Sequence, residues 1–265
     1  RMIRLVEAQY VGKSSWRENR SYEEAEQKTG NIGSVQKKYR QKAADPVAET
    51  LSDRKDNEDR PRAALTFDDG PSKVTGDILD ILKEEGVPAT FFVIAAENNE
   101  EYLPVLSRTA SEGHLIALHS GSHRYSEIYA SPEAFWQDLA ELREKLTPYV
   151  GNAQMNILRF PGGSTNTVSR KYGGSGIMKE LKAQAETYGF RYIDWDVCAN
   201  DAIGGRHSAS DIYKNVVEEA VQHNTCVVLM HDTKKETVQA LGDIIRWFKQ
   251  AGYRFDTVDH MPKSS

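Results

Sequence analysis

Seven short apolar runs alternate with amphipathic stretches from Ala63 to residue 258, and this alternation restricts the fold more than any other feature of the chain. Short apolar runs bounded by turn signals predict buried strands, and apolar residues spaced three and four apart predict helices. Strands that alternate with helices imply an α/β fold with a parallel sheet, open or closed into a barrel. The expected strands are 63–67, 89–94, 115–119, 157–160, 192–197, 226–231 and 253–258, and the expected helices are 74–85, 99–112, 132–147, 176–188, 210–223 and 236–250.

Glycines mark the ends of several of the expected helices. Gly86, Gly113, Gly189 and Gly252 each follow a helical pattern and come shortly before an apolar run. A glycine in the left-handed conformation is the common way to end a helix, so these positions support the boundaries. No glycine-rich dinucleotide fingerprint follows the first expected strand, which disfavours a Rossmann cofactor domain.

The charge of the chain is unevenly distributed. Residues 1–62 carry 14 Lys+Arg and 11 Asp+Glu, whereas the remaining residues carry 20 and 28. An acidic main part argues against a nucleic acid as partner. The polar stretch 1–61, which lacks apolar periodicity, is expected to be a leader or linker with short solvated helices, followed by one catalytic domain over 62–265. The two cysteines, Cys198 and Cys226, fall on different strands and are expected to be free thiols.

Chemically versatile side chains stand at the ends of five expected strands. Asp68 and Asp69 follow the first strand, His119 ends the third, and Arg159 lies in the fourth. Asp196 and Asp201 stand at or just past the end of the strand 192–197, and His231 ends the strand 226–231. In α/β barrels the carboxyl ends of the strands form the face on which active sites are built. The repeated coincidence predicts a site at this face.

The residue types fit a metal-dependent hydrolase. One Asp and two His make a divalent-metal triad, and a second Asp and a third His remain for proton transfer. Each feature also has a plainer interpretation: Asp68-Asp69 in a turn, His119 and His123 as a surface pair, and His231 as a core histidine. Their joint occurrence favours the hydrolase.

Four motifs carry a resemblance to a known family. They are Thr66-Phe67-Asp68-Asp69-Gly70, His119-Ser120-Gly121-Ser122-His123, Arg159-Phe160-Pro161-Gly162-Gly163 and Leu229-Met230-His231. In this order, over about residues 62–260, they resemble the motifs of the polysaccharide deacetylases with a NodB-homology domain, carbohydrate esterase family 4. The resemblance implies a distorted (β/α)7-type barrel of parallel strands and a hydrolase that removes acetyl groups from a glycan.

The resemblance also implies roles for the residues. One divalent metal ion would be held by Asp69, His119 and His123, with Zn²⁺ the first choice and Co²⁺, Ni²⁺ or Fe²⁺ as alternatives. Asp68 would act as the general base, and Arg159 would pair with it and keep it ionised.

A second group of residues would protonate the leaving amine and bind the substrate. His231 is the implied acid, and Asp201 would orient it. The substrate would be bound by Pro161, Gly162, Gly163 and Leu229, with backbone N–H groups of residues 160–163 holding an oxyanion.

The fourth family motif, Asp-x-x-Asp-Trp, departs from the family pattern here. Cys198 replaces the first Asp and Ala202 the Trp, and Gly162 stands where an aromatic is often found, so fewer sugar-stacking walls are expected. The favoured substrate is peptidoglycan N-acetylglucosamine, acted on by a monomer without a stable protein partner at the surface of a bacterium, membrane-anchored in the full-length protein. The alternatives are an O-acetyl glycan esterase on the same scaffold and a catalytically silent glycan-binding domain.

Overall fold

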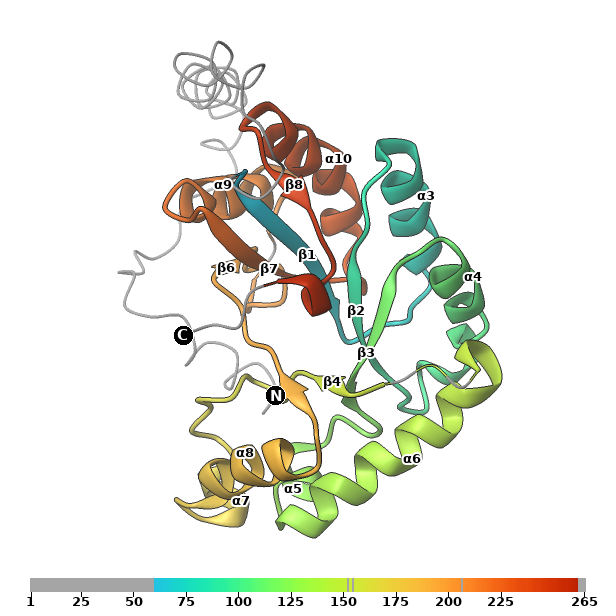
Figure 1. Cartoon of the computed structure of the whole chain (residues 1–265), viewed down its shortest axis with the longest axis vertical. Helices are drawn as coiled ribbons and strands as arrows, with labels where there is room; N and C mark the ends of the chain where they lie inside the picture. The colour runs from blue at the N-terminus through green and yellow to red at the C-terminus, as the bar shows by residue number, and fades with distance from the viewer. Residues whose placement is uncertain (1–59, 152, 154, 206, 262–265) are drawn as a thin grey trace.

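The computed structural model describes residues 60–261, apart from 152, 154 and 206. The expected leader, 1–61, therefore lies outside the described residues except for its last two positions. The described part is a parallel sheet with the strand order β5-β4-β3-β2-β1-β7-β6, in which β8 also pairs with β1 (Figure 1). The strands, which curl into a half-barrel, are β1 (Arg62–Asp68), β2 (Thr90–Ile94), β3 (Leu115–Ser120), β4 (Ile157–Leu158), β5 (Arg191–Tyr192), β6 (Val197–Cys198), β7 (Thr225–His231) and β8 (Arg254–Phe255).

Helices cover this sheet, and five of the six predicted helices form as single helices. They lie on its outer side, with α6 running below the lower ends of the strands in Figure 1. No helix among residues 60–261 is long and apolar enough to span a membrane. The helices are α3 (Thr75–Glu85), α4 (Val105–Ser111), α5 (Tyr125–Ile128), α6 (Pro132–Val150), α7 (Arg170–Gly173), α8 (Ile177–Thr187), α9 (Ala209–Ala220) and α10 (Lys235–Gln250), with short 3-10 turns η1 (Glu100–Tyr102) and η2 (Val258–His260).

Two of the predicted elements are divided in the structure. The predicted helix 99–112 becomes η1 and α4, separated at Pro104, whose missing N–H and fixed φ prevent a continuous helix. The predicted strand 192–197 is wrong as a single strand, because it forms β5 and β6 on opposite edges of the sheet. The backbone N–H of Ile193 donates to β4, whereas that of Asp196 donates to β7. The segment between them thus crosses from one edge of the sheet to the other.

The alternation of side chains along β1 separates the core from the site. Ala63, Leu65 and Phe67 belong to the main apolar core that the helices cover. Successive side chains of a strand point to opposite faces. Thr66 and Asp68 consequently share the inner face, where both contact the guanidinium of Arg159.

Candidate active site

The strand register brings the predicted residues together at one end of the sheet. Asp68, the last residue of β1, pairs directly with His231, the last residue of β7. His119 lies near the end of β3, two strands from β1. The carboxyl ends of these parallel strands therefore converge, as the sequence predicted.

Asp69, His119 and His123 form the cluster of ligand-type side chains that could hold a metal ion. Asp69 Oδ1 lies 3.4 Å from His119 Nε2 and 3.3 Å from His123 Nε2. It is buried and has no hydrogen-bond partner. Bonds of about 2.1 Å in a tetrahedral arrangement place ligand atoms about 3.4 Å apart, so the spacing fits a divalent cation. Burial alone would raise the pKa of Asp69, but the three neighbouring histidines, His231 included, hold it well below its usual range.

The two histidines are fixed by their surroundings. His119 Nδ1 lies 2.7 Å from the carbonyl oxygen of Arg159, which accepts a hydrogen bond from the Nδ1–H group and leaves Nε2 directed at Asp69. His123 sits in the left-handed region with φ of 55°. Its loop wraps around Asp138 of α6, whose carboxylate accepts from the backbone N–H groups of residues 121 and 122 at 2.7 and 2.8 Å. A Cβ at Gly121 would approach the Asp138 carbonyl oxygen to 2.8 Å, so this close passage requires glycine.

The loop that carries Asp69 is held in a similar way. Asp69 has φ of 69°, and Asn99 Nδ2 donates to its carbonyl oxygen at 3.0 Å. Gly70 packs against the buried carboxylate of Asp232, which a Cβ would approach to 2.1 Å. Thr75 at the start of α3 donates to Asp232 Oδ2 at 2.7 Å. The unusual backbone at Asp69 is thereby imposed by its neighbours.

Arg159 is completely buried and connects Asp68 to the segment that crosses between the two edges of the sheet. Its Nη1 donates to Asp68 Oδ1 at 2.7 Å and to Thr66 Oγ1 at 2.8 Å. Its Nε donates to the carbonyl oxygen of Ile193 and its Nη2 to that of Asp194, each at 3.0 Å. The other oxygen of Asp68, Oδ2, lies 3.8 Å from His119 Nε2, beside the candidate metal ligands.

His231 lies across the site and is held by Asp201. Its Nδ1 lies 2.8 Å from Asp201 Oδ1, and Asp201 Oδ2 accepts from the His231 backbone N–H and from Thr237 Oγ1 at 2.8 and 2.6 Å. Burial alone would lower the pKa of His231, but Asp201, Asp69 and Asp68 outweigh it and raise the pKa to about 10. The imidazolium can therefore hold a proton and present it at Nε2.

One cavity of about 300 Å³ is lined by the predicted carboxylates and imidazoles, whereas Arg159 lies outside its lining; the lining includes Asp68, Asp69, His119, His123, Asp201 and His231. Of the residues expected to bind substrate, Gly162 and Leu229 line this cavity. Pro161 and Gly163 lie outside its lining: the Pro161 carbonyl accepts from the hydroxyl of buried Tyr129, and the Gly163 N–H donates to the carbonyl oxygen of Phe160 at 2.7 Å. Since Pro161 has no N–H, the Gly162 N–H is the remaining donor of this turn near the cavity.

Several lining residues lie outside the sequence prediction. Trp195 and Tyr125 supply aromatic walls, although the family positions 162 and 202 are Gly and Ala. Both were overlooked because Trp195 belongs to the predicted strand 192–197 and Tyr125 comes after the second motif. Cys198 also lines the cavity, but burial raises the pKa of its thiol to about 12, which excludes a thiolate nucleophile near neutral pH. Both cysteines are free, as predicted.

Comparisons with known proteins agree with this geometry. Residues 55–176 match the family model described as polysaccharide deacetylase. A peptidoglycan-N-acetylglucosamine deacetylase of Bacillus cereus is 30% identical over 214 residues, which are 78% of this chain and 72% of that protein. A Listeria monocytogenes protein of the same description is 31% identical over 201 residues, and the match covers 76% of this chain but only 38% of that protein.

Solved structures show the same fold. The catalytic domain of a peptidoglycan N-acetylglucosamine deacetylase from Eubacterium rectale matches with a TM-score of 0.73 and 38% identity, covering 81% of this chain and 96% of that one. A carbohydrate esterase family 4 esterase from Streptococcus mutans matches with a TM-score of 0.64 and 29% identity, covering 79% and 90%. Sequence, fold and site geometry together show that this chain belongs to the polysaccharide deacetylase family, carbohydrate esterase family 4.

Proposed function

We propose that this glycan deacetylase hydrolyses the N-acetyl groups of peptidoglycan N-acetylglucosamine, releasing acetate and leaving a free amine on the polymer. The observation that carries the proposal is that one cavity combines a cluster of ligand-type side chains with two titratable groups held by other partners. Asp69 Oδ1 is buried without a partner between two imidazoles, while Asp68 and His231 are each held by a separate partner. The relatives named for peptidoglycan N-acetylglucosamine support the choice of polymer.

The proposed cofactor is one divalent cation, Zn²⁺ first, with Asp69, His119 and His123 as its ligands. When bound, such a cation supplies Lewis acidity, which polarises an amide carbonyl and acidifies water. Both histidines present Nε2 to Asp69, so the triad is arranged before any ligand arrives. Co²⁺, Ni²⁺ and Fe²⁺ also suit two imidazoles and one carboxylate.

The remaining residues move protons. Asp68, with Oδ1 held by Arg159, accepts at Oδ2 the proton of the attacking water. As the water oxygen bonds to the acetyl carbon and the C–N bond breaks, His231 gives the proton on Nε2 to the departing nitrogen. Asp201 at Nδ1 keeps His231 protonated and oriented. An N–H of the 160–163 turn would hold the developing oxyanion, and Gly162 is the member of that turn at the cavity.

The described residues of one chain supply every group in this scheme, and we propose that the enzyme acts as a monomer without a stable protein partner. We further propose that the enzyme works outside the cell or at the surface of a bacterium, where its polymer lies. Residues 1–61 would serve there as the leader that precedes the catalytic domain.

The test is acetate release from a panel of polymers, with metal content measured on the same sample. The panel contains peptidoglycan, N-acetylglucosamine oligomers and O-acetylated xylan. Release from peptidoglycan that depends on bound metal is expected. Release from the O-acetylated xylan alone would instead identify an esterase, and stoichiometric metal without any release would identify a glycan-binding domain.

A further inference from the structure

A second hollow, here called the side groove, adjoins the cavity at the candidate metal ligands. Asp69 and His123 line both hollows, so the triad lies where they meet. The side groove has a volume of about 400 Å³ and is more open than the cavity. A polymer whose reacting sugar lies at the triad can therefore extend into it. Its walls include Lys73 and Tyr102.

Lys73 is the one cationic side chain among the described residues that line the side groove. It is exposed and makes no ion pair or hydrogen bond to any residue in the described part of the chain. Nearby Lys145 differs, since its ammonium binds Glu100 and the carbonyl oxygen of Ala95 at 2.6 and 3.1 Å. An unpaired ammonium in a groove is available to a ligand.

Among the described residues that line the side groove, no free carboxylate compensates this charge; Glu97, next to Asn98, is exposed but lies outside the lining. The single carboxylate of the groove lining is Asp69, which the metal triad uses. In the adjoining segment, Glu100 is paired with Lys145, and Glu101 accepts a hydrogen bond from the Tyr102 hydroxyl. Residues 63–265 carry 20 Lys+Arg and 28 Asp+Glu, so the catalytic part has a negative net charge. The positive charge of Lys73 is therefore opposite in sign to that of the catalytic part as a whole.

We propose that the side groove binds the sugar next to the one being deacetylated, and that Lys73 selects a carboxylate on that neighbouring sugar. The inference rests on the proposed function and narrows its substrate class to glycans in which N-acetylglucosamine alternates with an acidic sugar. In peptidoglycan the carboxylate belongs to the lactyl group of the neighbouring sugar where no peptide is attached, and to the peptide where one is joined to that lactyl group by an amide bond. Neutral N-acetylglucosamine polymers lack both.

The expected effect is moderate because the charge is exposed. Solvent-exposed ion pairs contribute little, which corresponds to about a two- to fivefold preference for the acidic neighbour. Charges at a rim act through association and are screened by salt, so the preference should decline as ionic strength rises.

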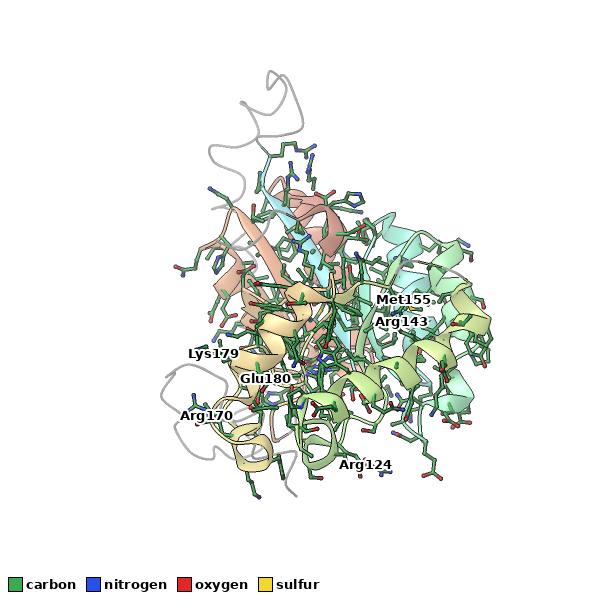
Figure 2. The ribbon with its side chains drawn as sticks, turned by 60° about the horizontal axis from the view of Figure 1, so that its bottom comes forward. Arg124, Arg143, Met155, Arg170, Lys179 and Glu180 are labelled. Carbon is green, nitrogen blue, oxygen red and sulfur yellow. The ribbon has the colours of Figure 1, made fainter. Side chains whose placement is uncertain are left out.

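The experiment uses the metal-loaded protein and three oligosaccharides of equal length. The first alternates N-acetylglucosamine with the acidic sugar bearing a free lactyl carboxylate, the second carries peptides on that sugar, and the third is neutral. The quantities measured are kcat/KM for acetate release and the dissociation constant by calorimetry, at low and high salt. The variants are Lys73→Ala and Lys73→Glu. Lys179→Glu on α8, labelled in Figure 2, makes the same charge change at an exposed position that lines neither hollow and serves as control.

The wild type and the Lys179→Glu control should prefer acidic oligomers, Lys73→Ala should abolish the preference, and Lys73→Glu should reverse it. A preference confined to the first oligomer assigns the lactyl carboxylate, one confined to the second assigns a carboxylate of the peptide, and a preference for both shows that Lys73 accepts either carboxylate. An acidic-to-neutral ratio that is unchanged in Lys73→Glu overturns the proposal. The binding data keep the two proposals separate: a Lys73-dependent binding preference without acetate release would retain the side groove and reject the deacetylase function.

Discussion

Replacing Arg159 should damage the fold as well as the chemistry. The guanidinium makes four hydrogen bonds, to Asp68, Thr66, Ile193 and Asp194, and none of its surface is exposed. Three of its nitrogens, pointing in different directions, supply these bonds. A lysine ammonium carries all its donors on one nitrogen and cannot reproduce that geometry.

The expected loss of unfolding free energy follows from the polar groups that are left without hydrogen-bond partners. In Arg159→Lys the carbonyl oxygens of Ile193 and Asp194 lose their donors. The buried Ile193 carbonyl alone costs about 1–3 kcal/mol, and the partly buried Asp194 carbonyl adds less than that. In Arg159→Met the carboxylate of Asp68, only 3% exposed, also loses its cation. Removing one partner of a buried pair costs about 3–5 kcal/mol, so Met should be at least as destabilising as Lys.

The assay is urea unfolding of the metal-free protein followed by circular dichroism, with acetate release measured after metal loading. Arg108→Lys is the matched control, because Arg108 binds Asp80 and Glu112 with its side chain 35% exposed. Exposed pairs contribute little, so this control should lose less than about 1 kcal/mol. An Arg159→Lys protein whose unfolding free energy stays within about 0.5 kcal/mol of the wild type would refute the reasoning.

Three further predictions concern the proposed chemical groups. The His119→Ala, His123→Ala double variant should lose its bound metal, measured by elemental analysis, and a chelator should lower Tm in the wild type only; stoichiometric metal in the variant would disprove the site. Asp68→Asn should retain the metal while kcat falls by about 10²–10⁴, and near-normal turnover would remove Asp68 from the mechanism. Asp201→Asn should move the alkaline limit of the pH–rate profile to lower pH, because Asp201 helps to raise the pKa of His231 to about 10. In stability terms the raised pKa favours the folded state fully below the unfolded value of about 6.5, and this contribution disappears as the pH rises through about 10; an unmoved profile would contradict the assignment.

The main strands and the cluster of ligand-type side chains were predictable because both are encoded locally. The apolar run before Asp68 and the one ending at His231 give two central strands, and parallel pairing then places their last residues side by side. The division of 192–197 was not predictable, because it depends on which distant strands accept its hydrogen bonds. The same non-local pairing brings Trp195 to the cavity.

The supporting contacts of the loops could not be predicted either. Asp138 lies in the middle of a helix, and nothing in its local sequence indicates that its carboxylate anchors the loop of His123. Asp232 follows His231 directly, yet its contact with Gly70 depends on the packing of two separate loops. Such contacts arise between segments far apart in the chain, where patterns of hydrophobicity carry no information.

The position of Arg159 has a consequence for how this enzyme can change over generations. The segment that crosses between the two edges of the sheet is fastened to the strands by the same guanidinium that pairs with Asp68. Selection for a folded protein therefore protects this arginine even where selection for turnover has ended. We expect descendants that abandon catalysis to lose Asp69 or one of its histidines first and to keep Arg159, so the arginine alone is a poor marker of an active enzyme.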